Sequence, residues 1–98
     1  MIRDAAIEQE LRQVLWACFE YWKNEVGASP QEQLICYSWV RDLYLERFGA
    51  DFHQSKLGAL EALGLLAKQE SSRGGHRAYY RLVNPSQAHE LLRGWQLV

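Results

Sequence analysis

The sequence predicts one small α+β domain, mostly α-helical, with a long N-terminal helix, a β-hairpin and a short C-terminal helix. Three observations lead to this prediction. Apolar residues recur every three or four positions through residues 3–26, which is the period of a helix. Two runs of alternating residues flank a Gly-Gly pair at 74–75, as in a hairpin. An Asn-Pro pair at 84–85 then opens another helical stripe. The composition, 48% hydrophobic and 23% charged over 98 residues, is typical of one globular domain spanning 1–98.

Residues 1–27 are assigned to the first helix, because 3–26 contain neither Pro nor Gly and Gly27 supplies a stop. An Ala-Ser-Pro loop follows. Residues 34–37 fit either a short strand or an extended link, and the pattern does not choose between them. The buried stripe of the helix is expected to consist of Ile7, Leu11, Val14, Leu15, Cys18, Tyr21 and Trp22.

Two shorter helices are expected in the middle of the chain, each ending at a glycine. Ser38 is a candidate N-cap for a helix over 39–48. Asp51 is a candidate cap for a helix over 52–63. The inward faces of the two helices are expected to be Val40, Leu43, Tyr44 and Phe48 in the first, and Leu57, Leu60 and Leu63 in the second.

The last third of the chain reads as a hairpin followed by a helix. Strands are expected over 65–70 and 76–83, the second with Tyr and Arg alternating against apolar residues. Asn84 is an expected N-cap and Pro85 the first helical residue, with the helix running to about Trp95. Its buried residues are expected to be Ala88, Leu91 and Leu92.

Four runs in this element order carry a family resemblance: DLYLERFG at 42–49, SKL at 55–57, LEALGLL at 60–66 and RGGHRAYYRL at 73–82. Two helices joined by a few residues and followed by a hairpin resemble the winged helix-turn-helix superfamily of bacterial regulators. The hairpin run is similar to the wing of PadR-like proteins.

The resemblance implies a winged helix-turn-helix fold in one domain. Its parts would be the long first helix (1–27), the helix-turn-helix (38–64), the wing (65–83) and a terminal helix (84–98). It also implies a DNA-binding transcriptional regulator, with the third helix in the major groove and the wing on the DNA backbone.

The net charge of −1 hides an uneven distribution. Residues 1–51 carry five basic and nine acidic groups, whereas residues 52–98 carry six basic and three acidic groups. Such asymmetry is typical of nucleic-acid contact, although it also arises by chance in small proteins.

Polar and basic residues of the third helix and the wing are the candidate nucleic-acid contacts, because such side chains bind phosphates and base edges. The alternative is that they form solvated helix and strand faces. The candidates are His53, Gln54, Ser55, Lys56, Lys68, Arg73, His76, Arg77, Tyr79 and Arg81.

Aromatic and apolar residues on the first and last helices predict a homodimer interface, consisting of Trp16, Phe19, Trp22, Leu92 and Trp95. The alternative is packing of the first helix against the last within one chain. Trp39 is expected in the core.

No catalytic or metal-binding motif occurs in the sequence, so we expect neither an enzyme nor a cofactor. The longest apolar run has six residues, far short of the roughly 20 that span a bilayer. Two cysteines without a CxxC spacing favour a cytoplasmic location, and Cys18 reads as core. A protein-interaction module without sequence-specific DNA binding is the alternative function, favoured by the near-neutral net charge and the acidic first half. RNA binding through the same wing is a third possibility that the sequence does not separate from DNA binding.

Overall fold

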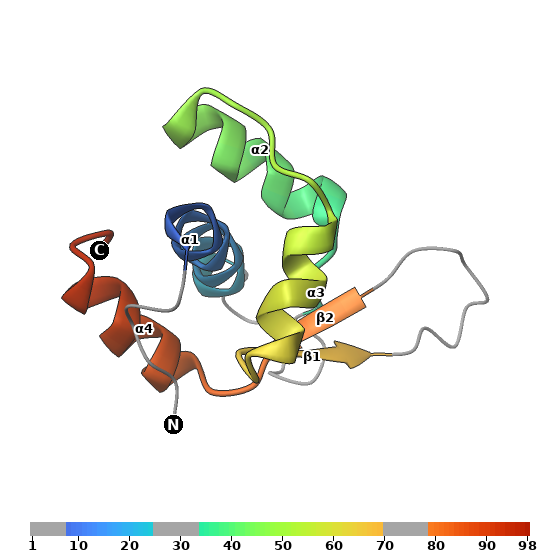
Figure 1. Ribbon diagram of the computed structural model, residues 1–98, viewed down its shortest axis with the longest axis vertical. Helices are drawn as coiled ribbons and strands as arrows, with labels where there is room; N and C mark the ends of the chain where they lie inside the picture. The colour runs from blue at the N-terminus through green and yellow to red at the C-terminus, as the bar shows by residue number, and fades with distance from the viewer. Residues whose placement is uncertain (1–7, 25–33, 70–78) are drawn as a thin grey trace.

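Helices surround a short antiparallel hairpin in the computed structural model, which describes residues 8–24, 34–69 and 79–98 (Figure 1). This arrangement confirms a small, mostly helical α+β domain. The described elements are α1 (Gln9–Asn24), α2 (Tyr37–Phe48), α3 (Ser55–Ala62), β1 (Leu66–Gln69), β2 (Tyr79–Leu82) and α4 (Pro85–Gly94).

Helix α1 occupies the centre of the domain and contacts α2, α3, α4 and β2. Figure 1 shows it nearly end-on, with α2 above it, α3 to its right and α4 at the lower left. The predicted apolar stripe is confirmed at Leu11, Val14, Leu15 and Cys18, whereas Tyr21 and Trp22 are only partly buried and Ile7 lies outside the described residues. The residues of α1 that are buried are Leu11, Val14, Leu15, Ala17, Cys18 and Phe19.

Strands β1 and β2 pair antiparallel, with Leu66 opposite Leu82. A further residue joins the other edge of β2. The Ile35 amide donates to the Tyr80 carbonyl at 2.7 Å, and the Tyr80 amide donates to the Ile35 carbonyl at 2.8 Å. The segment before α2 is therefore strand-like at Ile35, and the chain enters the helix at Tyr37.

The prediction that Ser38 caps α2 is wrong. The N-cap is Cys36, in an extended conformation and without a side-chain cap, and helix α2 begins one residue before Ser38. The backbone bridge at Ile35 fixes the chain as extended immediately before this point. The carbonyl of Cys36 then accepts hydrogen bonds from the amides of Trp39 and Val40. The Ser38 hydroxyl lies 3.3 Å from the Cys36 sulfur instead.

Asp51 is not the cap of α3 either. The N-cap is Gln54, and α3 begins at Ser55, so the helix is shorter than the sequence predicts. The Asp51 carboxylate is occupied elsewhere, because it accepts hydrogen bonds from the Phe52 amide at 2.7 Å and from the Tyr37 hydroxyl at 2.8 Å.

Four other boundary predictions are confirmed. Gly49 and Gly64 follow α2 and α3 with φ of 72° and 80°, a left-handed conformation that glycine adopts without steric cost. Asn84 caps α4, since its side-chain oxygen accepts a hydrogen bond from the Gln87 amide at 3.1 Å. Pro85 occupies the first turn of α4.

Candidate nucleic-acid interface

Two of the predicted contact residues at the start of α3 bind each other. The Nδ1 atom of His53 accepts a hydrogen bond from the Ser55 amide at 3.1 Å and lies 2.8 Å from the Ser55 hydroxyl. The imidazole thus satisfies one of the amides that a helix start leaves without an intrahelical partner. Gln54, between them, is exposed.

Lys56 faces the start of α1. Its ammonium nitrogen lies 3.7 Å from a carboxylate oxygen of Glu8 and 3.7 Å from one of Glu10. The lysine side chain is only 26% exposed. The positive charge of α3 is therefore balanced within the domain, which the sequence order did not indicate.

The rest of the accessible surface of α3 includes the small residues Gly58 and Ala62. Leu57 and Leu60 are buried, whereas Gly58 is partly exposed and Ala62 is exposed. A methyl group placed on Gly58 would meet no atom within 4 Å. The carboxylate of Glu61 accepts a hydrogen bond from the Lys68 amide at 3.1 Å, so it joins α3 to β1.

The described wing candidates divide between the two faces of the hairpin. Lys68 is paired with Tyr80, whereas Arg81 is paired with Ala67. Because directly opposite residues share a face, Lys68 lies on the face of the buried Tyr80, and Arg81 lies on the other face with Tyr79. Lys68 and Arg81 are both exposed. The predicted contacts Arg73, His76 and Arg77 lie outside the described residues.

Tyr79 belongs to an aromatic row that the sequence did not predict. Its ring lies 5.8 Å from that of Trp39, which stacks on Tyr21 at 5.6 Å with an interplanar angle of 16°. Trp39 is 38% exposed, so its expected place in the core is wrong. Tyr21 of α1 and Tyr79 of β2 each contact part of its ring, and the rest of the ring is exposed to solvent.

Two residues of the predicted dimer interface belong to the core of the single chain. Phe19 and Leu92 are buried among the residues where α1 meets α4. Phe19 also stacks on His89 of α4, with ring centroids 5.5 Å apart. This arrangement matches the alternative of packing between the first and last helices, and it removes these two residues from any dimer surface. Trp22 is partly buried beside Phe19, with centroids 5.7 Å apart.

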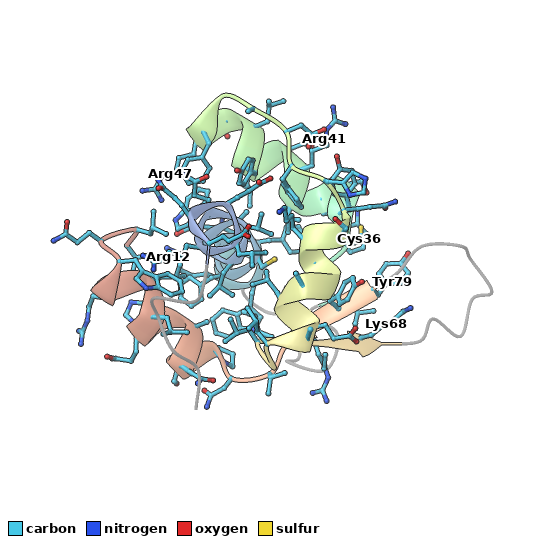
Figure 2. The ribbon with its side chains drawn as sticks, viewed as in Figure 1. Arg12, Cys36, Arg41, Arg47, Lys68 and Tyr79 are labelled. Atoms are coloured by element: carbon cyan, nitrogen blue, oxygen red, sulfur yellow. The ribbon has the colours of Figure 1, made fainter. Side chains whose placement is uncertain are left out.

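The other two tryptophans of that prediction are each covered by an arginine. The guanidinium of Arg47 lies over Trp16, 4.4 Å from the ring centroid, and that of Arg12 lies over Trp95 at 4.9 Å. Figure 2 shows Arg12 and Arg47 on the left of the molecule, whereas Lys68 and Tyr79 lie on the hairpin at the right. The two arginines thus lie on the opposite side of the molecule from Lys68 and Tyr79 in this view.

A polar cluster missed by the sequence reasoning joins α2 to the turn before α3. The Asp51 carboxylate lies 3.0 Å from Arg41 Nε and accepts the Tyr37 hydroxyl. Desolvation alone would raise the pKa of Asp51, but hydrogen bonds from Tyr37, the Phe52 amide and Arg41 outweigh it, so the pKa lies below its usual value. The pKa of Tyr37 is raised, by desolvation and then by this carboxylate.

Both cysteines are buried free thiols. Burial raises the pKa of Cys18 to about 12, which makes its thiolate scarce at neutral pH. Across the described residues, no group of three or more His, Cys, Asp or Glu side chains could hold a metal ion. Nor does any helix in that part of the chain have the length and apolar character needed to cross a membrane.

Comparisons of the sequence with models of protein families, with curated proteins and with solved structures gave no match.

Proposed function

We propose that the chain is a winged helix-turn-helix domain that binds double-stranded DNA and acts as a transcriptional regulator in the cytoplasm. The order of helix, strand-like residue, two helices, hairpin and helix supports this proposal. The bridge from Ile35 to Tyr80 adds a third extended segment to the hairpin, on the edge that β1 leaves open.

One observation carries the proposal: exposed Lys68 stands on the hairpin face that turns toward the helices, next to the end of α3. A duplex lying against α3 would bring its phosphates near this ammonium group. Among the described residues, neither Lys68 nor Arg81 forms an ion pair with a carboxylate. Arg73 and Arg77 add two cations to the same stretch of sequence.

Helix α3 would contribute shape more than charge. Its outward surface carries Gln54, Gly58 and Ala62, and small side chains let a helix backbone come close to DNA. Lys56 is engaged by glutamates, so most of the affinity would come from the wing. Phosphate contacts made by four wing cations correspond to a slope of about −3 to −4 in log K against log salt.

Fluorescence anisotropy with a labelled random-sequence duplex over a salt series tests the proposal. We expect Lys68→Gln to weaken binding to every duplex and to make the salt slope shallower by about 0.9. Lys23→Gln is the matched control, because Lys23 is also exposed but is paired with Glu20 within α1. A wild-type protein that binds no duplex at low salt would disprove the proposed function.

A protein-interaction module is the second candidate, and the neutralised charge of Lys56 favours it. A nearly uncharged helix surface that ends in Ala62 suits a protein partner better than a polyanion. The two candidates differ in one result: a DNA-binding domain of this type gives a non-specific Kd of about 1–100 μM, whereas a protein-interaction module gives no salt-dependent DNA binding.

Homodimerisation is a separate proposal. Because Phe19 and Leu92 are buried, the proposed interface consists of Trp16, Trp22 and Trp95, which are partly exposed. Sedimentation velocity over a range of protein concentrations tests it. A single species with the mass of one chain at all concentrations would contradict it.

A further inference from the structure

Two glutamates at the beginning of α1 hold the lysine of α3. Glu8 and Glu10 are 71% and 42% exposed, and each places a carboxylate oxygen 3.7 Å from the Lys56 ammonium. The lysine is the least exposed of the three. It is therefore directed toward α1 by the acidic pair, defined here as Glu8 and Glu10.

These ion pairs are suited to exchange. A separation of 3.7 Å is longer than a hydrogen bond, and exposed ion pairs contribute little to stability. The lysine side chain has a flexible stem of four carbons, so its ammonium can change position without movement of the helix. A phosphate oxygen can form a shorter, charge-assisted hydrogen bond with the same ammonium, at about 2.7–2.9 Å.

We propose that Glu8 and Glu10 compete with DNA phosphate for Lys56, and so act as positioning residues that control whether α3 contributes a charge to binding. This inference rests on the proposed DNA-binding function. In the free domain the acidic pair neutralises Lys56. In the complex the ammonium leaves the carboxylates for a phosphate that lies within its reach.

The competition lowers the affinity for DNA whose phosphates lie too far from α3 to reach the Lys56 ammonium. A phosphate beside Lys56 can replace the two carboxylates as the partner of its ammonium. If the lysine instead swings toward a more distant phosphate, the carboxylates of Glu8 and Glu10 are left without a partner and repel the DNA. The acidic pair therefore penalises loosely docked DNA more than well-docked DNA. The wing cations Lys68 and Arg81 lack such a penalty, since no carboxylate in the described residues pairs with them.

A cycle of variants tests this inference with the same labelled duplex. The first variant is Glu8→Gln with Glu10→Gln. Its matched control is Asp42→Asn with Glu46→Gln, which removes two exposed carboxylates of α2 and changes the net charge equally. We expect the first variant to bind about fivefold more tightly than the control, the value of two weak ion pairs. We also expect a steeper salt slope than the control shows.

The third variant adds Lys56→Gln to Glu8→Gln and Glu10→Gln, and we expect its affinity gain to fall to that of the α2 control. Lys56→Arg in the same background keeps the charge and should keep the gain. Equal gains for the first variant and the control would overturn the inference, as would a gain that survives Lys56→Gln. In both cases the wild type still binds DNA and the proposed function stands. Absence of binding by every variant overturns both.

Discussion

The guanidinium of Arg47, at the end of α2, covers the ring of Trp16 in α1 and also donates a hydrogen bond to the Leu97 carbonyl at 2.8 Å. One side chain thus joins three parts of the chain that are far apart in sequence. Arg47→Ala should lower the free energy of unfolding by about 0.5–1.5 kcal/mol, through loss of the cation–π contact and the hydrogen bond. Urea unfolding measures this change.

Arg93→Ala is the control for Arg47, because among the described residues its guanidinium contacts only the exposed Glu90, 3.2 Å away on the same helix. We expect its effect to stay within about 0.5 kcal/mol. Equal effects of the two substitutions would show that the Arg47 contacts contribute nothing beyond those of an ordinary surface arginine.

Leu92→Ala should lower the free energy of unfolding by about 2–5 kcal/mol, because Leu92 is fully buried between α4 and α1. Thermal unfolding followed by circular dichroism at two protein concentrations is the measurement. The loss should be independent of concentration, since the cavity forms within one chain. Leu45→Ala, at a site 41% exposed, is the control and should have little effect. A loss that grows on dilution would instead place Leu92 in an interface between chains.

Gly58→Ala should stabilise the domain by about 0.5–1 kcal/mol. Gly58 lies inside α3, where glycine is less favourable than alanine, and an added methyl group would meet no atom within 4 Å. Gly64→Ala is the contrasting variant, because it has equal space but a φ of 80°. Alanine in that left-handed conformation costs about 1–2 kcal/mol. Chemical unfolding of both variants should give changes of opposite sign, and the same sign for both would refute this explanation.

Asp51 should make stability depend on pH in the acid range. Its pKa is lowered in the folded state, so the folded form favours the carboxylate. The resulting stabilisation is complete above the unfolded-state pKa of about 4 and is lost as the pH falls through the folded-state pKa. Unfolding of the wild type and Asp51→Asn should therefore differ most above about pH 5 and converge at lower pH. A constant difference down to pH 2 would contradict this.

Cys18 should resist thiol reagents in the folded protein at pH 8, because it is buried and its pKa is about 12. Alkylation with iodoacetamide followed by mass spectrometry measures the modified fraction at this site. Labelling should become complete in urea, where the thiol is exposed. Rapid labelling of Cys18 without denaturant would show that α1 does not remain packed in the core.

Local sequence signals predicted much of the fold. The Asn84–Pro85 pair marks the start of α4 through the capping oxygen of Asn84. The glycines after α2 and α3 mark the ends of those helices through their positive φ angles. Ser38 and Asp51 carry the same kind of signal and are not caps. In both cases a contact with another part of the chain prevails over the local capping signal. The bridge from Ile35 to Tyr80 precedes the start of α2, and the hydrogen bond from Tyr37 engages the Asp51 carboxylate.

The candidate site was less predictable, because its electrostatics depend on contacts between residues far apart in sequence. Lys56 was a candidate nucleic-acid contact, and only the packing of α1 beside α3 brings Glu8 and Glu10 to it. Likewise, Trp39 was expected in the core from its hydrophobicity, although it lies at the surface between two tyrosines. Neither relationship has a periodic or short-range signature in the sequence.

The bridge between Ile35 and Tyr80 has a consequence for how the domain folds. These two residues are separated by almost half of the chain, so their hydrogen bonds close a long loop, which carries a high entropic cost. The hairpin can form locally, but its attachment to the helical half must await α2 and α3. We therefore expect the hairpin to reach its final orientation among the last steps of folding, and the Ile35 and Tyr80 amides to exchange with solvent through a local opening that leaves the helices folded.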